Sequence, residues 1–157
     1  MSEETFSYQQ QVHHEWVDYN GHMNDAAYAI VFSEAVDAFM TFIGLDAQAR
    51  EHHAYTIFTL ETHLCYLQEA LEGESLRVSV QLLDDDTKRL HVFFAMKNAQ
   101  GETIATSEQM LMGMDSTQGR PGPFPEHVAR RIDGLREAHQ NLSNPKQAGR
   151  QIGIKRK

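Results

Sequence analysis

Apolar residues recur at two different spacings along the chain, and these spacings predict the secondary structure. The segment AIVFSEAVDAFMTFIGL, residues 29–45, is apolar over more than one stripe of a helical period. A helix with so broad an apolar surface is largely buried. Asn24 suits the N-cap, Asp25 suits the positive end of the helix, and Gly44 suits its stop. We therefore predict one long buried helix between Asn24 and Gly44.

The other elements read as strands, because their apolar residues tend to alternate with polar ones. Residues 6–17 precede the helix and favour a first strand. Four further strands are predicted after the helix, with no other strong helix among them, at 54–67, 75–84, 90–98 and 103–115. The turns DDDTKR and AQGE are short enough to join antiparallel neighbours.

The remaining residues predict an appendage to this unit. Residues 116–126 form a linker rich in Pro and Gly, followed by a short helix at about 126–142 and a basic tail. We expect an α+β domain at 1–115, with 116–157 packed on the same domain. One helix covers only one face of a sheet, so the other face or an edge is expected to meet a second subunit.

Composition and charge narrow the function classes. The chain has 157 residues, 41% of them hydrophobic, and a net charge of −8. This acidic balance argues against nucleic acid as a partner, and no apolar run approaches the roughly 20 residues of a membrane span. The N-terminus is polar and does not resemble a secretory signal. Cys65 is the only cysteine, which fits a reducing compartment and predicts a cytoplasmic protein.

The stretch DYNGHMNDAAY, residues 18–28, holds the candidate chemistry. Asp18 alone is more often a turn residue, and His22 alone is more often structural. Their position before the buried helix favours a reaction centre over a structural turn, because a helix start offers unpaired N–H groups to a developing oxyanion. Asp18 would attack or activate water, with Asn20 and His22 placing the reacting groups. This set suits hydrolysis of an activated acyl group such as a thioester.

The pattern D-x-x-G-H-x-N-x-x-x-Y, from Asp18 to Tyr28, resembles the signature of hotdog-fold acyl thioesterases of the 4-hydroxybenzoyl-CoA type. The resemblance covers about residues 6–115. It implies a five-stranded antiparallel sheet wrapped around one long helix, with dimers that join their sheets edge to edge and active sites at the dimer interface. It also implies that Asp18 is the nucleophile or general base. The backbone amides of Gly21, Met23 and Asn24 would polarise the thioester carbonyl.

The C-terminal segments PFPEHVARRIDGLREA and NPKQAGRQIGIKRK are similar to a bacterial subgroup of this family associated with carnitine breakdown, the betainyl-CoA thioesterases. A trimethylammonium acyl group favours an acidic pocket with aromatic walls. The side chains expected around such a substrate are Trp16, Tyr19, Tyr28, Glu61, His63 and Tyr66, with Asp25, where related sequences often have Asn, as a second counter-charge.

Coenzyme A is expected only as part of the substrate, with no separate cofactor. Its phosphates are expected to meet Lys88, Arg89 and Arg150. The histidine pairs lack a metal-binding spacing, so no metal is predicted. The expected assembly is a homodimer, or a tetramer built from two. A hotdog-fold acyl-CoA hydratase or dehydratase, and a non-catalytic acyl-CoA-binding regulator, remain as alternatives.

Overall fold

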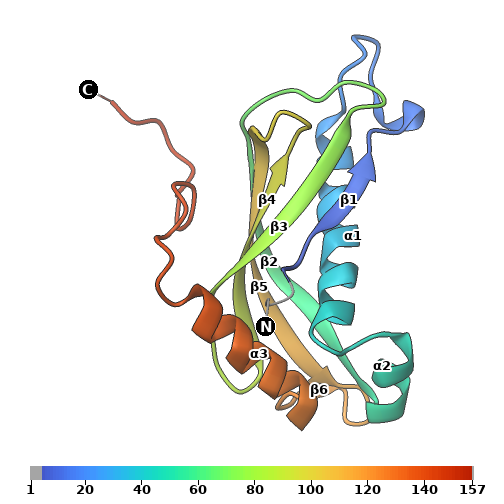
Figure 1. The fold of residues 1–157 in the computed structure, drawn as a ribbon, viewed down its shortest axis with the longest axis vertical. Coiled ribbons are helices and arrows are strands. Elements are labelled where there is room, and N and C mark those ends of the chain that lie inside the picture. Colours follow the sequence, from blue (N-terminus) through green and yellow to red (C-terminus); the bar gives the residue numbers. More distant parts are fainter. Residues whose placement is uncertain (1–4, 157) are drawn as a thin grey trace.

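A computed structural model describes residues 5–156 as one curved antiparallel sheet packed along a long helix (Figure 1). The sheet has the strand order β1-β3-β4-β5-β2, and a short β6 pairs with β5. The strands are β1 (Tyr8–Gln11), β2 (Tyr55–Tyr66), β3 (Ser75–Asp85), β4 (Arg89–Lys97), β5 (Thr103–Asp115) and β6 (Arg120–Pro121). The helices are α1 (Asp25–Phe42), α2 (Ala47–His53) and α3 (Glu126–His139), and a 3₁₀ turn spans His14–Trp16. This is the predicted hotdog architecture.

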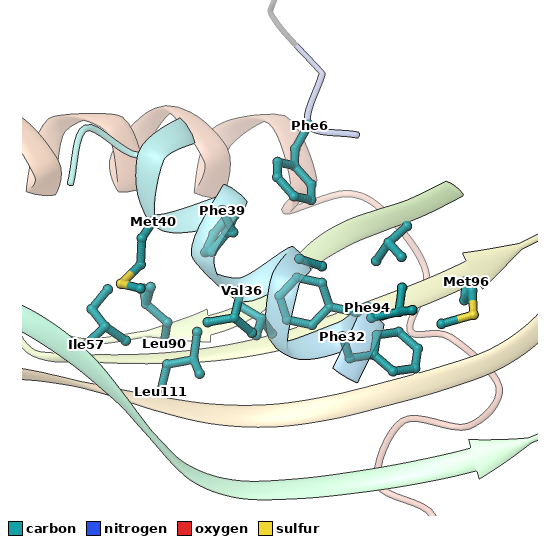
Figure 2. Close-up of a cluster of buried hydrophobic side chains, with 14 of the residues drawn as sticks. Phe6, Phe32, Val36, Phe39, Met40, Ile57, Leu90, Phe94, Met96 and Leu111 are labelled. Carbon is teal, nitrogen blue, oxygen red and sulfur yellow. The ribbon is translucent and has the colours of Figure 1, made fainter. Parts of the chain in front are cut away.

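Helix α1 supplies one side of the core. Its eight buried residues recur as adjacent pairs four residues apart and form one stripe that faces the core, so α1 is less completely buried than the sequence predicted. Figure 2 shows Phe32, Val36, Phe39 and Met40 of α1 pointing towards the sheet. Phe39 meets Phe94 of β4 edge to face, with ring centroids 6.1 Å apart. This packing fixes the helix against the sheet and so fixes the position of its N-terminus.

Two strand and helix predictions were wrong. The first strand covers Tyr8–Gln11 rather than 6–17, because the chain turns into the 3₁₀ segment that buries Trp16. Helix α2 was not predicted. None of its seven residues is buried, so no apolar period marks it. Its local signal is Asp46, whose carboxylate accepts a hydrogen bond from the amide of Ala49 at 2.8 Å.

The segment after β5 packs on the same core. Val128 and Ile132 of α3 are buried in the hydrophobic cluster that α1 and the sheet share. The imidazole of His127 donates to the carbonyl of Gly44 at the end of α1, 2.9 Å away. Arg136 forms a two-pronged ion pair with Asp85 at the end of β3. From α3 the C-terminal tail runs along the face of the sheet opposite α1 (Figure 1).

Within residues 5–156, no single helix is long and apolar enough to cross a membrane. The pair α1 and α2 reaches that length and hydropathy only across a 65° bend, and α1 is the core helix.

Candidate functional site

Asp18 to His22 form a tight turn directly before α1. The amide of Asp18 donates to the carbonyl of His22, and the amide of Gly21 donates to the carbonyl of Asp18, each at 2.9 Å. Gly21 has a φ of +78°, a left-handed conformation that glycine adopts without strain. A Cβ at this glycine would meet nothing within 4 Å, so the requirement for glycine comes from the backbone and not from space.

The turn holds one oxygen of the Asp18 carboxylate. Oδ1 accepts hydrogen bonds from the amides of Asn20 at 2.8 Å and His22 at 3.3 Å. Oδ2 has no hydrogen-bond or ion-pair partner among the described residues, and the side chain is exposed. Asn20 and His22 therefore orient Asp18 through their backbone amides, which leaves the second oxygen available.

Asn24 joins this turn to the helix. Its side-chain oxygen accepts from the amide of Ala27 at 2.9 Å, which confirms the predicted N-cap. Its side-chain nitrogen and its amide both donate to the carbonyl of Trp16, at 2.7 and 2.9 Å. One residue thus fixes the distance between the segment before the turn and the start of α1.

The loop between β2 and β3 holds the other side of the turn. The amide of Met23 donates to the carbonyl of Ala70 at 2.7 Å, and His22 pairs with Leu71 in an isolated antiparallel bridge. The imidazole Nε2 of His22 lies 3.2 Å from Oε2 of Glu69. The His22 side chain is therefore oriented by Glu69 rather than by Asp18. Glu69 was not among the predicted site residues, because a polar side chain at the end of a strand usually points into solvent.

The expected oxyanion amides need a correction. The amides of Gly21, Met23 and Asn24 already donate to the carbonyls of Asp18, Ala70 and Trp16. In the first turn of α1, the amide of Ala27 is capped, whereas those of Asp25 and Ala26 have no acceptor within residues 5–156. These two N–H groups lie at the positive end of the helix dipole and are the ones free to bind an oxyanion.

Tyr28 and Tyr66 lie together at the start of α1. Their rings meet edge to face at 5.2 Å. The Tyr28 hydroxyl donates to the carbonyl of Gln68, and the Tyr66 hydroxyl donates to the carbonyl of Asp25, both at 3.2 Å. Burial raises the pKa of Tyr28, and burial together with the Asp25 carboxylate raises the pKa of Tyr66. Both hydroxyls are therefore protonated donors at neutral pH.

The other predicted aromatic residues differ in their exposure. Trp16 is buried and stacks on His13, with ring centroids 4.0 Å apart. Tyr19 is 97% exposed at the tip of the turn. Trp16 thus belongs to the hydrophobic core, whereas Tyr19 is open to a ligand or to a second subunit that covers the turn.

Glu61 and His63 lie on the other face of the sheet from Tyr66. They pair with Met110 and Glu108 of β5 and line a groove of about 420 Å³ with Arg150 and Ile152 of the C-terminal tail. Their assignment to the Asp18 pocket is therefore wrong for a single chain. The two-residue alternation showed that Glu61 and His63 share a face of the strand. It could not show which face, because a bulge between Thr59 and Glu61 shifts the alternation and much of β2 is exposed on both faces.

The predicted coenzyme A contacts are also separated from Asp18. Lys88 and Arg89 lie at the β3–β4 turn, at the end of the sheet far from the start of α1 (Figure 1). Arg89 pairs with Asp86 at 2.6 Å. Arg150 lies on the outer face of the sheet. None of the three reaches the Asp18 turn of its own chain.

Comparisons with known proteins agree with this arrangement. The family model of the Thioesterase-like superfamily matches residues 12–132. The chain is 45% identical to a betainyl-CoA thioesterase of Pseudomonas aeruginosa over 98% of both chains. It is 41% identical to an L-carnitine dehydrogenase/betainyl-CoA thioesterase of a Rhizobium species, over 90% of this chain and 28% of that longer protein.

Solved structures show the same fold over nearly the whole chain. A Staphylococcus aureus protein solved in complex with CoA superposes with a TM-score of 0.92 at 37% identity, covering 99% of this chain and 98% of that one. A Pseudomonas putida protein superposes with a TM-score of 0.84 at 38% identity, covering 99% and 100%. The sheet order, the turn before α1 and these matches agree. The chain belongs to the thioesterase-like superfamily of hotdog-fold proteins.

Proposed function

We propose that this protein hydrolyses a thioester of coenzyme A with a small cationic acyl group, betainyl-CoA, to betaine and CoA. The proposal rests on the position of Asp18 directly before the start of α1. One carboxylate oxygen is fixed by two amides, the other is free, and open N–H groups follow within one helical turn. The name of the Pseudomonas aeruginosa relative, at 45% identity over 98% of the chain, supports the same substrate.

In the proposed reaction, the amides of Asp25 and Ala26 bind the thioester oxygen as it becomes negative. The free oxygen of Asp18 attacks the carbonyl carbon, or removes a proton from a water that attacks it. The carbon–sulfur bond breaks, and His22, held by Glu69, supplies a proton to the departing sulfur. On the covalent route, water then hydrolyses the acyl–Asp18 anhydride, which restores the carboxylate and returns a proton to His22. On the general-base route, the proton that Asp18 took from water returns to His22, and the product acid loses its own proton to solvent.

A cationic acyl group fits the charge and the aromatic residues around this helix start. Glu69 contacts the His22 imidazole, and Asp25 is the first residue of α1, so both carboxylates add negative charge around the helix start; no basic residue forms an ion pair with Asp25 within residues 5–156. The face of Tyr66 is half exposed next to Asp25. A quaternary ammonium has no N–H to donate, so nearby carboxylates and ring faces are the groups that attract it.

The proposed active form is a homodimer joined along β2. This strand is an edge of the sheet and carries large exposed apolar side chains, Phe58 and Leu60, at 52% and 53% exposure. An uncovered edge of this kind is a site for strand pairing. Two β2 strands related by a two-fold axis run antiparallel, which brings the far end of the second sheet, with Lys88 and Arg89, towards the Asp18 end of the first. We assign the coenzyme A phosphates to those side chains, and the protein to the cytoplasm.

A panel of acyl-CoA substrates tests the proposed activity. A thioesterase releases free thiol, a hydratase changes the absorbance of an enoyl-CoA without releasing thiol, and a regulator binds without either reaction. We expect thiol release from betainyl-CoA at a higher kcat/KM than from its neutral isostere, 3,3-dimethylbutanoyl-CoA. Equal or greater activity on the neutral isostere would overturn the cationic specificity, and no thiol release from any substrate would overturn the thioesterase.

A further inference from the structure

The C-terminal tail crosses the outer face of the sheet from one strand to the next. The side chain of Gln81 on β3 donates to the carbonyl of Ser143 at 3.2 Å. The amide of Gly149 then donates to Oε1 of Glu108 on β5 at 2.7 Å, and Oε2 of the same carboxylate lies 2.7 Å from His91 on β4. Ile152 follows beside Glu61 of β2, the edge strand. The tail therefore crosses the outer face from β3 towards β2, the edge strand that we assign to the dimer.

Beyond this anchor the amide of Arg150 donates to the carbonyl of Gln147 at 3.3 Å, and the residues that follow it are open to solvent as far as the structure describes them. Among the described residues, 151–156 have no hydrogen bond or ion pair and are all exposed. Ile152 is 91% exposed and Ile154 is 79% exposed. Two isoleucines in this segment are therefore presented to water, although burial of their side chains would be favourable.

The charge of the tail is opposite to that of the rest of the protein. Residues 150–157 carry four basic side chains, and the whole chain carries −8, so the first 149 residues carry −12. The tail is thus attracted to the surface of an acidic second copy more than to a neutral or basic partner.

A complementary surface lies on the outer face of β2 and β5. Phe58 pairs with Met112, and Glu61 pairs with Met110, so these four side chains share one face. Phe58 is 52% exposed and the methionines are partly buried. We propose that residues 151–156 strap the dimer by binding this face on a second copy, with the isoleucines on its Phe58 and methionines and the basic residues beside its Glu61. This inference rests on the proposed β2-edge dimer.

Sedimentation tests the strap through matched variants. We expect the wild type to be a dimer, and Ile152→Asp/Ile154→Asp to raise the dimer dissociation constant at least about tenfold. Removal of residues 152–157 has the same expected effect. The control is Leu142→Asp, an exposed apolar residue of the same tail before the Glu108 anchor, which should leave the constant unchanged.

Disulfide trapping tests the contact itself. In a Cys65→Ser background, Ile154→Cys/Phe58→Cys should give a covalent dimer on oxidation, seen on a non-reducing gel. An intramolecular disulfide only, or no disulfide, overturns the strap, as does a truncated chain that dimerises as tightly as the wild type. A monomeric wild type overturns the β2-edge dimer and the strap together, whereas a tight dimer that ignores the tail variants overturns the strap alone.

Discussion

The Asp18 carboxylate accepts a hydrogen bond from the backbone amide of Asn20 at 2.8 Å. This contact is also the ordinary turn role of an Asp, because a side-chain oxygen that bonds an amide two residues on stabilises a turn. The two roles use different oxygens: Oδ1 holds the turn, and Oδ2 remains free to react. The role of a turn residue and the role of a nucleophile are therefore compatible in the Asp18 side chain.

Asn24→Ala should reduce both stability and turnover. It removes the cap on Ala27 and a hydrogen bond to Trp16, at a cost of about 1–2 kcal/mol in the free energy of unfolding. It also frees the turn from the helix start, so kcat should fall. Urea unfolding and steady-state kinetics measure the two effects.

The matched control is Asp46→Ala, which removes the equivalent cap from α2. It should cost similar stability with kcat unchanged. If both variants lower kcat equally, the loss reflects general destabilisation and not the link between the turn and α1.

Asp25→Asn should reduce the preference for a cationic acyl group. The side chain keeps its size and its place in the first turn, and the backbone amide is retained, so the oxyanion contact survives. A unit charge at about 4–6 Å in a partly exposed site is worth about 1 kcal/mol or more, so the ratio of kcat/KM for betainyl-CoA to that for 3,3-dimethylbutanoyl-CoA should fall about tenfold. An unchanged ratio would remove Asp25 from substrate recognition.

Tyr28 should make the fold sensitive to alkali. Burial holds its pKa above the ordinary value in the folded state, whereas the unfolded chain releases the proton at about pH 10. The contribution of Tyr28 is therefore complete below about pH 10 and is lost as the pH rises through the folded pKa. The unfolding free energy of Tyr28→Phe should fall less steeply above pH 10 than that of the wild type. Tyr19→Phe, at the exposed tip of the turn, should keep the wild-type slope.

Leu60→Lys should separate the proposed dimer. Leu60 lies at the β2 bulge with 53% of its surface exposed, and a lysine on a sheet edge opposes strand pairing. We expect a folded monomer by sedimentation and circular dichroism, with thioesterase activity lost because the coenzyme A contacts come from the second copy. An active monomer would contradict the shared site.

Elements marked by local chemistry could be predicted from the sequence. The cap at Asn24 and the strand Thr103–Asp115 lie at the predicted positions, since a capping side chain and an alternating run act over a few residues. Helix α2 could not be found by apolar period because it buries nothing. The strand over 6–17 was overextended because Trp16 is buried by a 3₁₀ turn and not by a strand.

The site was predicted in its position but only partly in its contacts. Asp18 lies at the start of the core helix, as the order of elements implied. The amides of Met23 and Asn24 donate to the carbonyls of Ala70 and Trp16. The amides without an acceptor are therefore those of Asp25 and Ala26. Such pairings depend on the tertiary fold and leave no periodic trace in the sequence. The face of Glu61 and His63 was hidden for the same reason.

The hydrolytic role of the free Asp18 oxygen is tested by Asp18→Asn. Asn keeps the side-chain oxygen that accepts from Asn20 and His22, so the turn and the fold should persist, while the free carboxylate oxygen is lost. Thiol release from betainyl-CoA should fall by about 10²–10⁴-fold with the unfolding transition unchanged. Asp37→Asn, an exposed change on α1, the helix that follows the Asp18 turn, should retain wild-type activity. Turnover by Asp18→Asn within a few-fold of the wild type would contradict the account.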